Sequence, residues 1–174
     1  MDQKVIIRLA TTADAAIISL LGRVTFTETF GHLFQEHNDL LEYYDRTFSV
    51  KKITRSLSKK NNVYWLALVN DLPVGYAKLK LDSPTPFLEG KDVCQLQKIY
   101  VLKDFLSLRI GLVLQQTLIE KAAKSDCDYI WLSVLKDNER AVKFYFKNGF
   151  KVLGDHNFSI GREHFDFMAM AKEF

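Results

Sequence analysis

A strand–helix–strand succession in the second half of the chain most constrains the fold. The runs CQLQKIYVL (94–102) and DYIWLSVL (128–135) predict two strands. Between them apolar residues recur every four positions, at Ile110, Leu114, Leu118 and Ala122. This spacing predicts a helix over 109–124. Because a strand–helix–strand unit crosses over right-handed to a parallel neighbour, two parallel strands are expected within one sheet.

The remaining segments predict further strands and helices around this unit. Additional strands are expected at 4–10, 63–70, 74–82, 150–154 and 164–174. Additional helices are expected from Thr11 to about Phe30 and over 39–48, 50–60 and 137–148. The chain therefore predicts an α/β (mixed α+β) fold. Its central sheet would be mixed but mostly antiparallel, with about seven strands and helices on both faces. No repeat or linker composition appears, so residues 1–174 are expected to form a single domain.

Composition excludes several classes of protein. A length of 174 residues and 48% hydrophobic content fit one globular domain. The net charge of +3 is too small to argue for a nucleic-acid partner, and no known reader motif is present. No apolar run approaches the ~20 residues of a membrane span, and MDQKVIIRLA lacks the apolar core of a signal peptide. We therefore expect a cytoplasmic enzyme, monomeric or homodimeric, that engages neither nucleic acid nor membrane.

Two cysteines occur, Cys94 and Cys127. Their separation matches no metal-binding spacing, so no metal site is expected. In an intracellular protein such cysteines are usually reduced and buried. We therefore expect two buried thiols.

The segment FLSLRIGLVL (105–114) joins the first of the two strands to the predicted helix. Backbone N–H groups point outward at a helix N-terminus, so such a junction is a natural anion site. Phosphate loops usually carry several glycines, whereas this one has only Gly111, with Arg109 two residues before it. From these residues alone, a phosphate-binding turn and an ordinary connection both remain open.

A motif near the C-terminus carries a family resemblance. The pattern Asn-x-x-Ala-x-x-Phe-Tyr-x-x-x-Gly-Phe is present in full, as Asn138, Ala141, Phe144, Tyr145, Gly149 and Phe150. Together with the strand ending in IYVL and the turn that opens a long helix, it resembles the GNAT superfamily of N-acetyltransferases. In the N-terminal half, TFTETFGHL (25–33), Tyr44 and PVGYAKL (73–79) are similar to PaiA-type spermidine/spermine acetyltransferases.

The resemblance implies acetyl-CoA as cosubstrate and no metal. It assigns the coenzyme pyrophosphate to the turn, at Leu106, Ser107, Leu108, Arg109, Ile110 and Gly111. Leu106 replaces a polar residue of the family pattern and Arg109 replaces its first glycine. Arginine is strained if that position needs a positive φ and tolerated if it is helical. The pantetheine arm is expected along the backbone of Ile99, Tyr100 and Val101.

The resemblance also suggests catalytic roles. Tyr145 is expected to be the general acid, because its reference pKa of ~10 keeps the hydroxyl protonated at neutral pH. Asn138 either contacts the coenzyme or caps its helix. Gln95 stands where many family members have a glutamate base, and an amide cannot take a proton. The base is thus left open between a water chain and Glu28.

The acceptor is approached through charge. Between Val24 and Asp45 the chain has no Lys or Arg but five acids, Glu28, Glu36, Asp39, Glu42 and Asp45, with aromatic residues interleaved. Such a segment suits a small cationic amine such as a polyamine, with Glu28, Tyr44 and Gln95 as candidate acceptor-binding residues. The alternative is a solvated acidic helix face over an aromatic core. The predicted function is acetyl-CoA-dependent N-acetylation of a primary amine; the alternative is a catalytically weak acyl-CoA sensor of the same fold.

Overall fold

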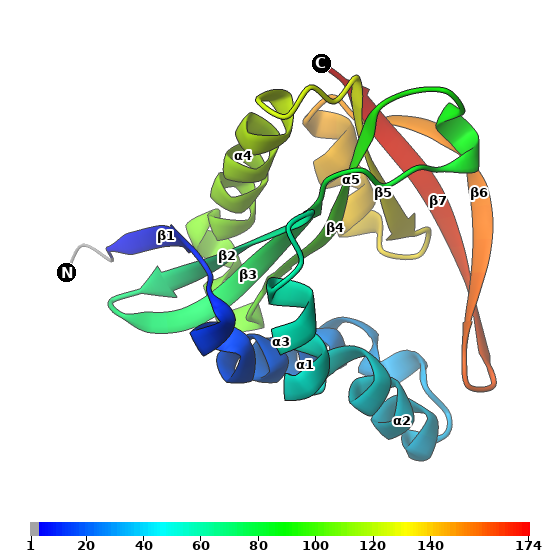
Figure 1. Ribbon diagram of the computed structural model, residues 1–174. Coiled ribbons are helices and arrows are strands. Elements are labelled where there is room, and N and C mark those ends of the chain that lie inside the picture. Colours follow the sequence, from blue (N-terminus) through cyan, green and yellow to red (C-terminus); the bar gives the residue numbers. More distant parts are fainter. Residues whose placement is uncertain (1–3) are drawn as a thin grey trace.

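A seven-stranded sheet runs through the molecule and carries helices on both faces (Figure 1). The computed structural model describes residues 4–174. The strands are β1 (Val5–Leu9), β2 (Asn62–Val69), β3 (Leu72–Lys80), β4 (Val93–Val101), β5 (Tyr129–Leu135), β6 (Lys151–Ile160) and β7 (Glu163–Glu173). The α-helices are α1 (Ala15–Phe30), α2 (His37–Phe48), α3 (Val50–Leu57), α4 (Ile110–Ala123) and α5 (Glu139–Lys147). Short 3₁₀ turns are η1 (Thr12–Asp14), η2 (Gly31–Leu33), η3 (Pro86–Leu88) and η4 (Lys103–Leu108).

The strand order β1-β2-β3-β4-β5-β7-β6 confirms the predicted mixed, mostly antiparallel sheet. Strands β4 and β5 are parallel, as the crossover through α4 requires. Their pairing covers only Val93–Gln95 against Tyr129–Trp131. Beyond it the two strands part. A register shift lies between β3 and β4, where Lys98 pairs with Lys78 but Leu96 pairs with Leu79, so Gln97 is an extra residue on β4. Such a bulge bends its strand, here next to the point of parting.

Helices cover the two faces of the sheet unequally. Helix α4 packs on one face through fully buried Ile110, Leu114 and Leu118. Helices α1, α2 and α3 cover the opposite face, and Figure 1 shows them grouped below the sheet. Neighbouring residues of β3 point to opposite faces, because Ala77 faces the α4 side while Tyr76 packs beneath α1.

One turn and one strand differ from the sequence prediction. The β2–β3 turn is Asn70–Asp71, both with positive φ (48° and 67°), and not Asp71 to Pro73. Asn and Asp tolerate this conformation, and a two-residue turn of this kind matches the twist of a hairpin. Strand β6 has 10 residues and extends to Ile160, well beyond the predicted 150–154. The segment pairs with β7 along its length, but its polar composition lacks the apolar pattern by which a strand is predicted from sequence.

The cysteine prediction is wrong. Cys94 and Cys127 form a disulfide, with their Cα atoms 6.1 Å apart. Cys94 lies within the short parallel pairing of β4 with β5, and Cys127 lies two residues before the first residue of β5. The pairing brings the two residues within disulfide range although they are 33 positions apart in sequence.

Within residues 4–174, no helix is both long and apolar enough to cross a membrane.

Helices α1 and α2 meet at a glycine. A Cβ atom at Gly22 would lie 2.5 Å and 2.8 Å from two ring carbons of Phe48 and 3.1 Å from the Tyr76 hydroxyl oxygen. Phe48 is fully buried and contacts Phe26, Tyr43 and Tyr44. Gly22 therefore sets the distance at which α1 passes over the end of α2.

We predict that Gly22→Ala destabilises the protein although alanine is the better helix former. Helix propensity favours alanine by about 1 kcal/mol, but displacement of a buried ring costs about 1–3 kcal/mol beyond that gain. Urea unfolding followed by circular dichroism measures the difference. Gly111→Ala is the matched control, because a Cβ at Gly111 meets no atom within 4 Å. A Gly22→Ala variant as stable as this control would contradict the close-packing argument.

Candidate functional site

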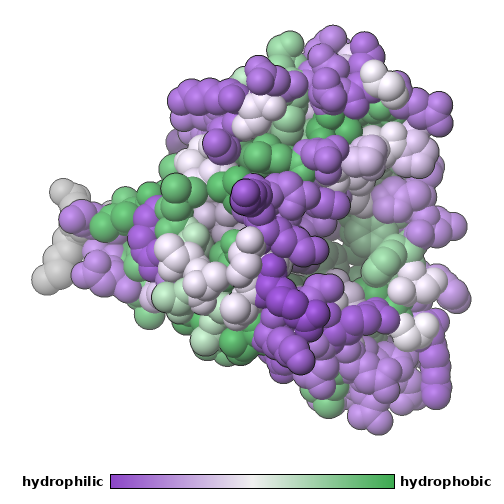
Figure 2. Space-filling model, viewed as in Figure 1, coloured by the Kyte–Doolittle hydropathy of each residue, from purple (hydrophilic) through white to green (hydrophobic). Residues whose placement is uncertain are grey.

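A cleft of about 1050 Å³ opens where β4 and β5 part. Its walls are Gln95–Val101 of β4, the junction of η4 with α4, one side of α5, the end of β5, and residues of α1, α2 and the β6–β7 hairpin. Figure 2 shows a hollow between the lower helices and the hairpin, with apolar residues inside it. The cleft is long enough to reach both faces of the sheet.

The splayed part of β4 presents a free strand edge to this cleft. Ile99, Tyr100 and Val101 pair with β3 on one side. Their other side faces the cleft, since the register with β5 ends at Gln95. Backbone N–H and C=O groups on such an edge can pair with an extended ligand, as an added strand would. The three residues predicted for the pantetheine arm are thus placed along the cleft.

The predicted phosphate turn forms η4 followed by one residue in the left-handed region. Arg109 has φ 57° and ψ 21° and directly precedes α4. Of the two alternatives for Arg109, the structure therefore selects the positive φ, which costs a non-glycine residue on the order of 1 kcal/mol. Leu106, Arg109 and Gly111 line the cleft. The side chains of Leu108 and Ile110 pack against the α4-side core, so only their backbones can serve a ligand.

Gly111 stands in the first turn of α4 without a structural need for glycine. Its φ is not positive, and a Cβ there would meet no protein atom within 4 Å. The bare backbone instead faces the cleft at the positive end of the helix dipole. The glycine keeps this space open for a group that approaches the helix N-terminus closely.

Helix α5 forms the wall opposite this turn. The Asn138 Oδ1 accepts a hydrogen bond from the Ala141 N–H at 3.2 Å, so Asn138 caps the helix. It also lines the cleft. Tyr145 lies on the same wall, and its ring centre is 5.6 Å from that of Phe150. Burial raises the pKa of Tyr145 above its ordinary value, which keeps the hydroxyl protonated.

Gln95 of β4 and Glu28 of α1 both line the cleft. The Gln95 Oε1 accepts hydrogen bonds from Ser83 Oγ at 3.1 Å and from Gln97 Nε2 at 3.4 Å. Glu28 Oε2 accepts a hydrogen bond from the Lys103 N–H at 3.0 Å. Glu28 therefore ties α1 to the first residue of η4, and one of its two carboxylate oxygens is engaged in that tie.

Rings from both halves of the chain enclose the end of the cleft on the α1–α2 side of the sheet. This aromatic chamber consists of Phe26, Phe30, Tyr43, Phe158, Phe165 and Phe167. Tyr44, which was predicted to bind the acceptor, is not among the residues that line the cleft. The Tyr44 side chain is buried, and its hydroxyl shares a hydrogen bond with Thr27 Oγ1. Tyr43, its neighbour in sequence, lines the chamber instead.

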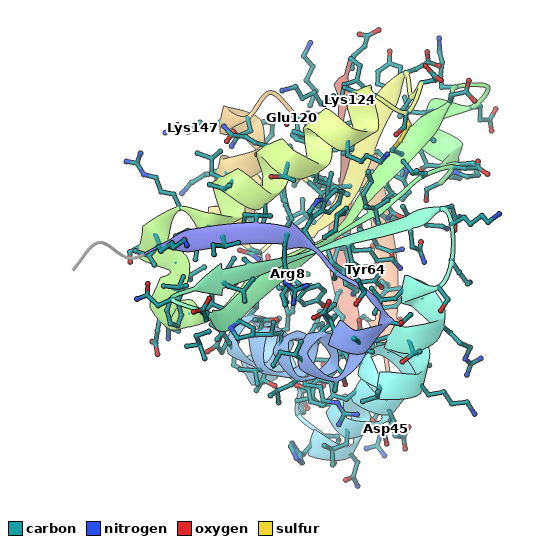
Figure 3. All side chains as sticks on the ribbon, turned by 60° about the vertical axis from the view of Figure 1, so that its left-hand side comes forward. Arg8, Asp45, Tyr64, Glu120, Lys124 and Lys147 are labelled. Atoms are coloured by element: carbon teal, nitrogen blue, oxygen red, sulfur yellow. A yellow bond between two sulfur atoms is a disulfide. The ribbon has the colours of Figure 1, made fainter. Side chains whose placement is uncertain are left out.

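The acidic segment does not surround the cleft. Of its five acids only Glu28 is a lining residue. Asp39 accepts a hydrogen bond from the Arg162 N–H at 2.9 Å, and Asp45 pairs with Arg23 at 3.1 Å. Figure 3 shows Asp45 at the outer surface of α2. The alternative of a solvated acidic helix face over aromatic residues therefore describes most of this segment. Apart from Glu28, the charged residues that line the cleft are basic, namely Lys98, Lys103, Arg109, Arg140 and Lys147.

Two features of the cleft had no counterpart in the sequence predictions. Ser133 Oγ and His156 Nε2 are hydrogen-bonded at 2.6 Å across β5 and β6. No sequence signal pointed to His156, because its strand was not predicted to extend that far. Lys98 lies on the same face of β4 as Tyr100, and its Nζ is 5.0 Å from the ring centre of Phe48. Burial lowers the pKa of Lys98 to about 8. The sequence signal that could have identified Lys98 is a lysine in the middle of a predicted strand.

Within residues 4–174, no group of three or more His, Cys, Asp or Glu side chains is arranged to hold a metal ion.

Sequence comparison assigns most of the chain to one family. The profile of the Acetyltransferase (GNAT) family matches residues 25–150. An uncharacterised N-acetyltransferase from Lactobacillus delbrueckii subsp. lactis is 25% identical over 141 residues, covering 81% of each chain. An uncharacterised N-acetyltransferase from Mycobacterium bovis is 27% identical over 134 residues, covering 77% of this chain and 81% of the relative.

Solved structures share the fold over nearly the full length. A PaiA N-acetyltransferase from Thermoplasma acidophilum, solved in complex with coenzyme A, superposes with a TM-score of 0.75 at 20% identity, covering 98% of this chain and 99% of that one. A GNAT-family acetyltransferase from Streptococcus pneumoniae superposes with a TM-score of 0.72 at 23% identity, covering 98% and 100%. At this level of identity the likeness confirms the predicted architecture.

We predict that Gly111→Ala weakens acetyl-CoA binding without weakening the fold. The added methyl occupies the space in front of the helix N-terminus, and we expect Kd to rise about tenfold, equivalent to about 1.4 kcal/mol. Isothermal titration calorimetry measures the affinity, and thermal unfolding without ligand is the control. An unchanged Kd would show that the ligand does not approach this backbone.

A second prediction concerns the partly buried charge of Lys98. Its folded-state pKa of about 8 lies below the unfolded value of about 10.4, so the unfolded chain binds more protons between these pH values. The free energy of unfolding therefore gains from Lys98 as pH rises through this window. At pH 7 we expect Lys98→Met to be more stable than the wild type by about 1–3 kcal/mol.

Urea unfolding at pH 7 and pH 9.5 tests this, and the advantage of Lys98→Met should shrink at the higher pH. Lys51→Met is the matched control, because Lys51 is exposed on α3 and should change stability little at either pH. A constant difference between wild type and Lys98→Met at both pH values would contradict the lowered pKa.

Proposed function

Because this chain belongs to the GNAT family of acetyltransferases and uses acetyl-CoA as its acetyl donor, we propose that it acetylates a primary amine bound in the aromatic chamber. The observation that carries the proposal is the position of Tyr145. Its protonated hydroxyl belongs to the same cleft as the free edge of β4 and the turn before α4. One cleft therefore holds a donor of a proton, a strand edge for an extended ligand and an anion site.

The coenzyme would occupy the end of the cleft formed by η4, α4 and α5. Backbone N–H groups at the start of α4 would bind the pyrophosphate, with Gly111 allowing its close approach. Lys103, Arg109, Arg140 and Lys147 line this part of the cleft and supply positive charge for the phosphates. The pantetheine arm would run along Ile99–Val101. Asn138 fixes the start of α5 and borders the same path.

The reaction requires attack of a neutral amine on the thioester carbonyl. The amine nitrogen forms a bond to the carbonyl carbon, and the resulting tetrahedral intermediate collapses as the C–S bond breaks. Tyr145 donates its proton to the departing thiolate, which leaves as the CoA thiol. The proton lost by the amine passes to a water chain or to Glu28, whose second carboxylate oxygen is not engaged by Lys103. Gln95 contributes a fixed amide near this point and takes no proton.

A polyamine is one candidate acceptor. The rings of Phe26, Phe30 and Tyr43 can hold an ammonium group through cation–π contacts, and Glu28 supplies one carboxylate. The similarity in fold to a PaiA N-acetyltransferase points the same way. The remaining acids of the segment lie away from the cleft, which favours a small amine over a long polycation. The alternative, a sensor that binds acetyl-CoA without turnover, would leave the protonated hydroxyl of Tyr145 in the cleft without a role.

We predict that Tyr145→Phe lowers kcat by about 10²-fold or more, because the thiolate would leave without a proton. The Kd for acetyl-CoA should change less than about twofold, since the ring and its packing on Phe150 are kept. A thiol-release assay with a panel of primary amines measures turnover, and calorimetry measures binding.

Tyr129→Phe is the matched control, because Tyr129 lies on β5 outside the cleft. Unchanged turnover in Tyr145→Phe would remove Tyr145 as the general acid. Tight acetyl-CoA binding by the wild type without thiol release from any amine would favour the sensor.

A further inference from the structure

Lys98 places a cation at the floor of the aromatic chamber. Its Nζ is 5.0 Å from the ring centre of Phe48 and 5.7 Å from that of Tyr100. Phe48 in turn lies 5.9 Å from the rings of Phe26 and of Tyr43, both of which line the chamber. The ammonium group is therefore held between rings, partly buried, and open to the cleft on one side.

No carboxylate of the described chain neutralises this charge. The salt bridges found among residues 4–174 do not include Lys98. Glu28, the one acid that lines the cleft, is engaged with the Lys103 N–H. The residue directly opposite Lys98 on β3 is Lys78, whose Nζ lies 5.4 Å from the ring centre of Tyr64. Tyr64, labelled in Figure 3, packs on the face of the sheet that α1 and α3 cover.

Two like charges opposite each other on neighbouring strands are unfavourable, and burial adds to the cost. Burial acts on both lysines, and the like charge acts on Lys78. Burial lowers the pKa of Lys98 to about 8. Burial, followed by the charge of Lys98, lowers the pKa of Lys78 to about 7. Two lysines therefore face each other at this point of the sheet, and no salt bridge among the described residues includes either of them.

The coenzyme does not account for Lys98. The residues assigned to its phosphates lie on η4, α4 and α5, on the far wall of the cleft. Lys98 lies on the opposite face of β4, against α2. Tyr100, two residues further along the strand, has its ring centre 5.7 Å from Lys98 Nζ and lines the cleft together with Tyr145. The cation therefore belongs to the part of the cleft that holds the acceptor.

We propose that Lys98 binds a carboxylate of the acceptor, so that the preferred substrate is a small amine that also carries a carboxylate, as amino acids do. The inference rests on the proposed amine acetylation. It adds an anchor at the floor of the aromatic chamber, with the apolar body of the acceptor against Phe26, Phe30 and Phe165. The amine then extends along the strand toward Tyr145. An acceptor without the carboxylate leaves the ammonium of Lys98 facing that of the amine.

Pairs of substrates that differ only in the carboxylate test this directly. L-Phenylalanine is compared with phenethylamine, and L-leucine with isopentylamine, in the thiol-release assay with acetyl-CoA; spermidine is included as the cationic alternative. A charge-assisted contact in a partly buried site predicts that kcat/KM for the wild type favours the carboxylate member of each pair by about tenfold or more.

Variants of the two neighbouring lysines show which of them produces the preference for a carboxylate. Lys98→Met should lower kcat/KM for the amino acids by about tenfold or more, chiefly through KM, so that the preference for the carboxylate member of each pair is lost. Lys98→Arg should restore part of the preference. Lys78→Met is the matched control, because Lys78 is equally placed on the next strand but does not line the cleft. It should retain the preference for the carboxylate.

The outcomes separate this inference from the proposed function. Turnover of spermidine or of simple amines without preference for a carboxylate overturns the inference and leaves the function standing. An equal loss of preference in Lys78→Met also overturns it, because a general potential then explains the effect. If no amine releases thiol, the proposed function fails. Calorimetry with N-acetyl-L-phenylalanine then tests separately whether Lys98 binds a carboxylate. Binding to the CoA-loaded wild type that is lost in Lys98→Met supports it, and equal binding overturns it.

Discussion

The parting of β4 from β5 is the constraint on which the rest of the structure depends. A parallel pair normally continues for the length of both strands, because each unpaired backbone group loses a hydrogen bond. Here the pairing ends after three residues on each strand, and a bulge on β4 turns the strand aside. The free edge that results lies in the interior, where a ligand can satisfy its N–H and C=O groups. Every proposed contact of the coenzyme arm and of the acceptor follows from this single opening.

The two ends of the cleft differ in how they hold charge. At the coenzyme end, cationic side chains lie near solvent and beside a helix N-terminus, an arrangement that suits phosphates at little cost in desolvation. At the chamber end, one lysine is set among rings beside a second lysine of the same charge. Isolated buried charge is expensive, so such an arrangement reads most simply as half of an ion pair whose other half is a ligand.

The order of the elements was predictable because it follows from hydrophobic periodicity, which is local. The parallel β4–β5 pair followed from the crossover through α4, and the cap at Asn138 from its position before a helix. The disulfide, by contrast, depends on which strands pair and where pairing stops, and no spacing between Cys94 and Cys127 reports that. Acids in the first helices were visible in the sequence, but the direction in which each points depends on how α1 and α2 meet at Gly22. Arg109 was recognised as an anomaly, and only its backbone angles decided between the two alternatives.

The disulfide has a mechanical consequence. It joins β4 to the loop that leads into β5, at the end where the two strands are still paired, so the two strands are covalently fixed at one end and free to part at the other. The segment of β4 from Gln95 to Val101 is roughly 20 Å long at a rise of about 3.3 Å per residue. A rotation of this segment by about 5° at the disulfide would therefore move its far end, at Val101, by nearly 2 Å. Reduction of the disulfide would leave β4 and β5 in place but let the angle between them vary, and the binding of a thin, extended ligand between the strands would weaken first.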